Sequence, residues 1–298
     1  MPVTEMPATK MPATKMNAAA AFGARAAERR VLPGFAPAIG LTLTYLGLII
    51  MIPLAALMLR AAGVGPAGLI AILRQPRTLA AFRVSFGLSL AAAAVNAAIG
   101  LLLAWVLARR RFPGRRLIDA AIDLPFALPT AVAGITLATL YSNTGWLGAR
   151  LAPLGITVSY TRLGIFVALV FIGLPFVVRA VQPLIADLDR EAEDAARTLG
   201  ASDTAIFWRV IFPALLPGVL TGSALAFARG VGEYGSVIFI AGNVPGVSEI
   251  VPLLIVTKLE EFDYAGAAAI ATVMLLASFA ILIAVNRAEQ WARQRHGG

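Results

Sequence analysis

The sequence contains no cysteine and only one histidine, His296. Without cysteine the chain can form no disulfide, no thiolate metal site and no cysteine nucleophile. A single histidine cannot build a histidine-based metal site, and three residues from the end it is not expected in a buried catalytic triad. These absences exclude cysteine- and histidine-based catalysis. The chain is expected not to be an enzyme and to hold no metal, although carboxylates remain as possible catalytic groups.

Lysine is almost as scarce, with Lys10, Lys15 and Lys258 as its only occurrences. Each follows a threonine, so the Gly-Lys-Ser/Thr sequence that ends a phosphate-binding loop does not occur in the chain. If ATP drives this protein, another chain hydrolyses it.

Charged residues are also few. They make up 14% of the 298 residues, whereas hydrophobic residues make up 59% and the mean hydropathy is +0.82. Soluble domains carry about 25% charged residues. The composition is that of a protein built for a lipid bilayer.

Long apolar runs are what the sequence has in place of charge. A helix that crosses the hydrocarbon core needs roughly 20 apolar residues. Two prolines four residues apart, Pro125 and Pro129, are expected to kink the third run. The sequence predicts an all-α membrane protein with six transmembrane helices, at about residues 36–59, 82–107, 117–141, 163–184, 214–240 and 264–285.

The formal net charge of +9 follows this topology and does not indicate a nucleic-acid partner. Of the 25 Lys and Arg residues, the six spans put seventeen on one side of the membrane, seven on the other and Arg229 within a span. Positive charge is concentrated in cytoplasmic loops of membrane proteins. Both termini are therefore predicted to be cytoplasmic.

A polar segment at residues 190–213 separates the fourth and fifth spans. Glu191, Glu193 and Asp194 come early, where acidic side chains favour a helix N-terminus. Small apolar residues follow and lead to Gly200, which can end a short helix in the left-handed conformation. Composition alone leaves two interpretations open: a docking surface, or a solvated loop whose acids only cap a helix.

The spacing in this segment favours docking, because it resembles the cytoplasmic coupling loop of ABC importer permeases. The family pattern reads Glu-Ala-Ala, three residues, Gly, nine residues and Ile-x-Leu-Pro. The spacing matches throughout, and the three differences are conservative. The positions that match in this chain are Asp194, Ala195, Ala196, Gly200, Val210, Phe212 and Pro213.

The resemblance implies a type I ABC importer (MetI-like) permease fold over residues 34–298, with a short helix around residues 194–202 seated in a groove of an ATPase subunit. Closure of two ATPases on ATP would move two permease loops together. No cofactor is expected on this chain, since ATP and Mg²⁺ would bind the partner ATPase. The residues implied to couple to the ATPase are Glu193, Asp194, Ala195, Ala196, Gly200, Ala201 and Pro213.

Arg229 and Glu233 lie four residues apart in the fifth span, so they can face the same side of a helix. Ionisable groups inside a membrane usually face the bundle interior or a wet path. Together with Tyr234 they form the candidate translocation path for an anion. The spacing leaves open a second interpretation, an internal ion pair that only holds helices together.

Other polar residues in the spans give weaker signals. Asn96 lies in the second span, and Asp119 and Asp123 lie in the third. Asp119 follows Arg115 by four residues, which favours an ion pair at the membrane interface. Residues 230–235 match the dinucleotide fingerprint G-x-G-x-x-G, but that fingerprint requires a βαβ unit. Nucleotide binding there is rejected, because the match lies in an apolar helical run.

Two further runs narrow the resemblance. Residues 232–243 look like the signature of the T-type permease of sulfate/thiosulfate ABC importers. Residues 112–116 and 123–134 are similar to sulfate and molybdate permeases together, so a molybdate or tungstate permease is the alternative. The sulfate branch implies a second, W-type permease, two copies of an ABC ATPase, a periplasmic or external sulfate-binding protein, and a place in the bacterial inner membrane.

Two rival classes are weaker. An ion-coupled secondary transporter would usually show an inverted repeat, and the halves of this chain show no internal similarity. An intramembrane enzyme would need a catalytic set, and only Asp119 and Asp123 could supply one.

The first 33 residues are expected to form a disordered tail. They contain the pentapeptide Met-Pro-Ala-Thr-Lys twice in tandem, at residues 6–10 and 11–15. An alternative is translation from an upstream start, with Met16 nearer the true one. Residues 34–298 are expected to form one permease domain.

Overall fold

The computed structural model describes residues 35–296, and these contain helices and no strand. The tail at residues 1–33, with its repeated pentapeptide, lies outside the described residues. The chain divides into two units that meet between Ala55 and Ala56, inside helix α2 (Phe35–Ala62). The second unit contains every other described helix and all the candidate site residues.

Five helices in the described part of the chain are long and apolar enough to cross a membrane. The prediction of an all-α membrane protein is confirmed, and five of the six predicted spans correspond to long helices. These are α2, α4 (Pro76–Arg109), α9 (Arg162–Ala186), the helical run Asp203–Val231 that contains α12 (Phe212–Val231), and the first part of α15 (Tyr264–His296).

Local sequence explains where these helices begin. Pro76 starts α4 at a position where its missing N–H is not needed. The side chain of Thr161 accepts hydrogen bonds from the backbone N–H groups of Leu163 and Gly164 and so caps α9.

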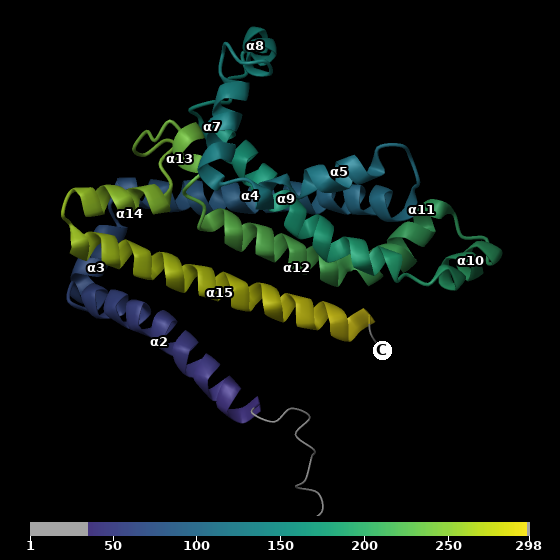
Figure 1. Ribbon diagram of the computed structural model, residues 1–298, viewed down its shortest axis with the longest axis horizontal. Helices are drawn as coiled ribbons and strands as arrows, with labels where there is room; N and C mark the ends of the chain where they lie inside the picture. The colour runs from purple at the N-terminus through teal and green to yellow at the C-terminus, as the bar shows by residue number, and fades with distance from the viewer. Residues whose placement is uncertain (1–34, 297–298) are drawn as a thin grey trace, which may run out of the picture. The chain divides into compact units, whose positions relative to one another are not determined.

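Helices α4, α9 and α12 form the core of the second unit and lie side by side (Figure 1). Val177 on α9 is fully buried between helices α4 and α12. A Cβ added to Gly100 of α4 would lie 2.8 Å from the Val177 Cβ, and one added to Gly222 of α12 would lie 2.7 Å from the Val177 Cα. Glycine therefore permits the close approach of all three helices at this level.

The third predicted span is not a continuous helix. Residues 117–141 fall in three short helices, α5 (Arg115–Ile122), α6 (Leu124–Ala127) and α7 (Thr130–Tyr141). The breaks lie at Asp123 and at Leu128 with Pro129. Leu128 is extended because the residue before a proline is disfavoured in the helical region. The prolines that were expected to kink this span interrupt it.

Beyond α7 the chain forms α8 (Gly148–Leu151) and the short helix η2 (Ala152–Leu154), which project from the core bundle of this unit (Figure 1). Helix α3 (Gly65–Leu73) packs against α4 and α15.

The fifth span was predicted at residues 214–240, and this prediction extends too far toward the C-terminus. α12 ends at Val231, and a turn leads into the separate helix α13 (Val237–Ile240). The turn packs tightly on α7, because a Cβ on Gly134 would lie 2.3 Å from the carbonyl oxygen of Ser236. Helix α14 (Val251–Glu260) then packs on α15 and α4.

Candidate functional site

The polar segment between α9 and α12 folds into a short helix, α10 (Arg190–Thr198). The Asp189 side chain accepts a hydrogen bond from the backbone N–H of Glu191 at 2.8 Å and caps the helix. Gly200 has φ +84°, the left-handed conformation predicted for the end of this helix. Two more short elements, α11 (Asp203–Ile206) and the π-helical turn η3 (Phe207–Ile211), lead directly into α12.

Helix α10 has two faces with different surroundings. Asp194, Ala195 and Leu199 are exposed, and Leu199 keeps 88% of its surface accessible. Ala196 and Ala201 instead pack against the buried cluster formed by α4, α9 and α12. The residues predicted to couple to an ATPase thus separate into an outward set, which also includes Gly200, and an inward set. Pro213 lies in the first turn of α12 and is half-buried.

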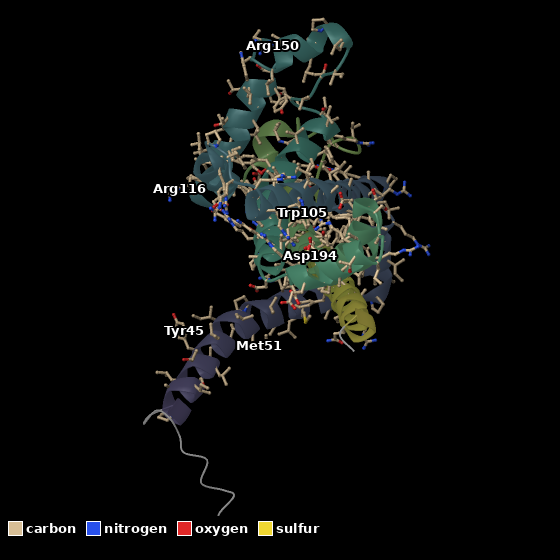
Figure 2. All side chains as sticks on the ribbon, turned by 90° about the vertical axis from the view of Figure 1, so that its right-hand side faces the viewer. Tyr45, Met51, Trp105, Arg116, Arg150 and Asp194 are labelled. Atoms are coloured by element: carbon tan, nitrogen blue, oxygen red, sulfur yellow. The ribbon has the colours of Figure 1, made fainter. Side chains whose placement is uncertain are left out.

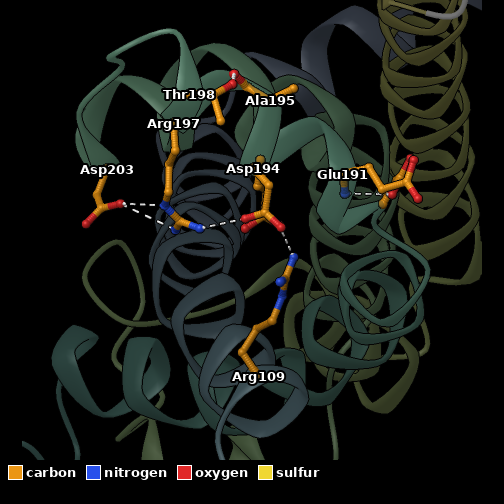
Figure 3. A network of polar contacts seen from close by, with 9 residues as sticks. Arg109, Glu191, Asp194, Ala195, Arg197, Thr198 and Asp203 are labelled. Carbon is orange, nitrogen blue, oxygen red and sulfur yellow. Dashed lines mark hydrogen bonds and ion pairs between the residues drawn. The ribbon is translucent and has the colours of Figure 1, made fainter.

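Glu193 belongs to the inward set and is only 8% exposed. Its carboxylate forms an ion pair with Arg109, the last residue of α4. The Arg109 guanidinium also lies over the ring of Trp105, 5.0 Å from its centroid. Figure 3 shows Arg109 reaching from α4 toward α10. Sequence reasoning missed this partner.

On the outward side, Arg197 lies 3.2 Å from an Asp194 oxygen and 3.4 Å from an Asp203 oxygen (Figure 3). These side chains are exposed, and such pairs contribute little to stability. Between α10 and the end of α4 lies an open pocket of about 340 Å³. Two of its lining residues, Trp105 and Asp194, are labelled in Figure 2. Its lining is rich in charge: Trp105, Arg109, Arg110, Arg190, Glu193, Asp194 and Arg197.

The second candidate site lies where α12 ends. Arg229 forms an ion pair with Glu233, so the two residues are together as the spacing predicted. Glu233, however, is not in the helix, because α12 ends two residues before it. Its other oxygen accepts hydrogen bonds from the backbone N–H and the hydroxyl of Ser236, both at 2.9 Å. Tyr234 follows in the same turn and is half-buried.

Burial within this pair is uneven. The Glu233 side chain is 2% exposed, whereas 37% of the Arg229 side chain is accessible. The carboxylate is enclosed and paired, whereas its arginine partner keeps part of its side chain accessible. The site can therefore offer a positive group to an anion without presenting the negative one.

The expected pairing of Asp119 with Arg115 is wrong. Asp119 and Asp123 both bind Arg179 of α9, with shortest oxygen–nitrogen separations of 2.7 Å and 2.5 Å. Asp119 lies within α5 and Asp123 caps its end, four residues on, so both carboxylates are on the side of α5 that meets Arg179. With two acids around it, Arg179 is not available to attract an anion.

Two other sequence features also have structural explanations. Asn96 is fully buried where α4 meets α9, and its amide has no hydrogen-bond partner among the described residues. The G-x-G-x-x-G match straddles the end of α12, and neither side of it is a strand. This agrees with the rejection of a dinucleotide site, although the match does not lie wholly inside a helix as expected.

A further ion pair was not anticipated. Arg77, at the start of α4, binds both oxygens of the buried Glu249 at 2.8 and 2.7 Å. The described residues contain no group of three or more His, Cys, Asp or Glu side chains placed to hold a metal ion.

Comparison with known proteins shows which family has this architecture. The family described as "Binding-protein-dependent transport system inner membrane component" matches residues 97–295. The chain is 50% identical over 253 residues to the sulfate transport system permease protein CysT of Synechocystis sp., covering 85% of this chain and 88% of the relative. The corresponding CysT of Escherichia coli is 48% identical over 260 residues, which cover 87% and 94% of the two chains.

Solved structures agree on the fold. A chain of a bacterial ABC transporter that imports the acidic polysaccharide alginate superposes with a TM-score of 0.71 at 14% identity, over 90% of this chain and 98% of that one. A chain of the MetNI methionine ABC transporter in an inward-facing conformation gives a TM-score of 0.55 at 16% identity, over 72% and 96%. At such identities the likeness shows the type I ABC importer permease fold alone. The chain therefore belongs to the family of binding-protein-dependent transport system inner membrane components, in the branch of the sulfate permeases.

Proposed function

We propose that this chain is a permease subunit of an ATP-driven sulfate/thiosulfate importer, which forms the translocation path and couples to a separate ATPase. The relatives named sulfate transport permeases support the substrate class. The observation that carries the coupling role is α10 itself: a short, capped helix between two long helices, with an exposed small-residue face and a left-handed glycine at its end.

The outward face of α10 is the docking surface in this proposal. Asp194 offers a carboxylate to a basic group of the ATPase, and Ala195 and Gly200 let the partner approach the backbone. Leu199 is the most exposed large apolar side chain of the described residues. Burial of a leucine contributes roughly 1.5–3 kcal/mol, so it is suited to fill an apolar groove on the partner.

The energy comes from outside this chain, which has no phosphate-binding loop. Two copies of an ABC ATPase would bind ATP and Mg²⁺ and draw the docking helices of two permeases together. The second permease is a W-type subunit, and an external sulfate-binding protein delivers the ion. Substrate selectivity then rests largely on that binding protein.

Arg229 supplies the path with its positive group. Glu233 would repel a dianion if it faced the path, but it is enclosed and bound to Arg229 and Ser236. The accessible part of the Arg229 guanidinium then contacts the passing ion, and the pair also fixes the turn after α12.

The test is uptake of labelled sulfate by cells that lack their own sulfate permease and receive this chain, its W-type partner and its ATPase. The proposal predicts restored uptake that excess unlabelled molybdate barely reduces. Uptake that molybdate abolishes would move the substrate to molybdate or tungstate. Uptake that persists without the ATPase would instead support an ion-coupled transporter and overturn the proposal.

A further inference from the structure

Within α10, the adjacent acids Glu193 and Asp194 point in opposite directions. Asp194 is exposed, whereas Glu193 is buried against the end of α4 and paired with Arg109. A helix that only docked on a partner would need no charged residue on its hidden side. Burial of a carboxylate is costly unless it is paired, so this arrangement calls for an explanation of its own.

Arg109 joins α4 to α10 at this point. It ends α4, where a positive charge is favoured by the helix dipole. Its guanidinium binds Glu193 of α10 and lies over Trp105. Trp105 in turn makes an edge-to-face contact with Phe207, with ring centroids 6.0 Å apart.

Phe207 is the first residue of the π-helical turn η3, which leads into α12. Turns of this kind are rare and occur frequently at functional sites. The chain of contacts Glu193–Arg109–Trp105–Phe207 therefore connects α10 to the end of α4 and to η3, which continues along the backbone into α12.

The Arg109–Glu193 ion pair is more buried than the ion pairs on the outer face of α10. Only 14% of the Arg109 side chain and 10% of the Glu193 side chain are exposed. Removal of one partner from such a pair leaves an uncompensated buried charge. The Arg197 pairs on the outer face are exposed to solvent, which screens them. A displacement of α10 is thus expected to carry the end of α4 with it.

We propose that Arg109 and Glu193 form a latch that transmits the movement of α10 to α4 and, through Trp105 and Phe207, to α12. The inference rests on the proposed function, since it assigns the latch to coupling between an ATPase and this permease. Both are positioning residues: neither touches the transported ion, and the latch sets how much of the ATPase motion reaches the membrane helices.

The experiment uses the complete transporter in proteoliposomes and measures sulfate ions taken up per ATP hydrolysed. Glu193→Gln and Arg109→Gln each remove one charge. Both variants are expected to co-purify with the ATPase and hydrolyse ATP, while the transport ratio falls at least about fivefold, the lower end of typical coupling between sites. The double reversal Arg109→Glu with Glu193→Arg restores an ion pair. Its transport ratio is expected to exceed the ratio of either reversal, Arg109→Glu or Glu193→Arg, made alone.

Asp203→Asn is the matched control, because it removes an exposed carboxylate of the same segment and is expected to leave the ratio unchanged. A purely structural role for the pair would lower the yield of assembled complex without changing the ratio. An unchanged ratio in both single variants overturns the latch. If Glu193→Gln or Arg109→Gln fails to assemble, the double reversal provides the test. A transport ratio of the double reversal that is no higher than that of a single reversal contradicts the proposal. Absence of ATP-dependent uptake by the wild-type complex would instead refute the proposed function.

Discussion

Glu233 lies four residues after Arg229 and binds it from beyond the end of helix α12, with its remaining oxygen held by Ser236. The carboxylate is thereby neutralised and enclosed in the turn between α12 and α13. In the proposed function Arg229 is therefore the residue of the pair that meets the anion, and this leads to the first prediction.

Arg229→Gln is expected to reduce sulfate uptake about tenfold or more, because a hydrogen bond to a charged group contributes roughly 1.5–3 kcal/mol and about 1.4 kcal/mol corresponds to tenfold. The measurement is uptake at equal amounts of assembled transporter. The control is Arg150→Gln, which removes an arginine of the projecting helix α8 that lies over the Trp146 ring. Equal uptake by the two variants would mean that the Arg229–Glu233 pair has only a structural role.

The end of α10 gives a second prediction. Gly200→Arg is expected to abolish ATP-coupled uptake while the chain remains in the membrane, because a large side chain would stand between α10 and the ATPase. The position also has φ +84°, a conformation that costs a non-glycine residue about 1–2 kcal/mol. The measurement is uptake together with co-purification of the ATPase.

Gly155 offers a control with the same backbone cost. It has φ +73° in the turn after η2, and a Cβ added to it, like one added to Gly200, would have no atom within 4 Å. Gly155→Arg should leave uptake near wild type. If both variants lose uptake alike, backbone strain and not loss of docking explains the effect.

Packing of the three core helices gives a third prediction. Gly222→Ala would place a Cβ 2.7 Å from the Val177 Cα, so the helices must separate. Overpacking of this kind typically costs about 1–3 kcal/mol, and a lower apparent Tm in detergent is expected. Gly87→Ala on α4 adds the same methyl group where nothing lies within 4 Å, and its Tm should not fall. Equal Tm values would contradict the close approach described here.

A fourth prediction concerns pH. Asp263 Oδ1 accepts a hydrogen bond from the backbone N–H of Gly266 at 2.8 Å, and Lys258 Nζ lies 3.2 Å from Oδ2. The Gly266 hydrogen bond first, and then Lys258, lower the pKa of Asp263 below its ordinary value of 3.8. Because the folded state binds this proton less tightly than the unfolded state, the stabilisation is present above pH 3.8 and is lost as the pH falls through the lowered pKa.

Asp263→Asn keeps an acceptor for Gly266 and removes the charge. The variant should have a lower apparent Tm than wild type at neutral pH, and the difference should shrink below pH 3.8. A difference that does not change with pH would mean that the charge of Asp263 does not stabilise the start of α15.

The long helices and the docking segment could be predicted from the sequence because their signals are local. Apolar length identifies α4, α9 and α15, and Gly200 marks the end of α10 before any contact is known. The breaks were underestimated. Prolines were expected to kink the third span, yet Pro129 stands between separate helices. The apolar residues of α13 led the predicted fifth span to continue past Val231, where α12 has already ended.

Partner choice could not be read from local spacing. Asp119 was assigned to Arg115 because four residues separate them, but in the structure it binds Arg179 of α9, 60 residues away. Glu193 and Arg109 are 84 residues apart. They meet because the last residue of α4 lies beside the first turn of α10. The signal that could have paired them was their opposite charge on one predicted side of the membrane.

The most direct test of the account is ATP-dependent accumulation of radiolabelled sulfate in proteoliposomes that contain this chain, its W-type partner, the ATPase and the sulfate-binding protein. The account predicts accumulation that requires ATP and all four components and that disappears with Gly200→Arg in this chain. Accumulation without the ATPase, or accumulation unaffected by Gly200→Arg, would contradict the claim that this permease is driven through α10.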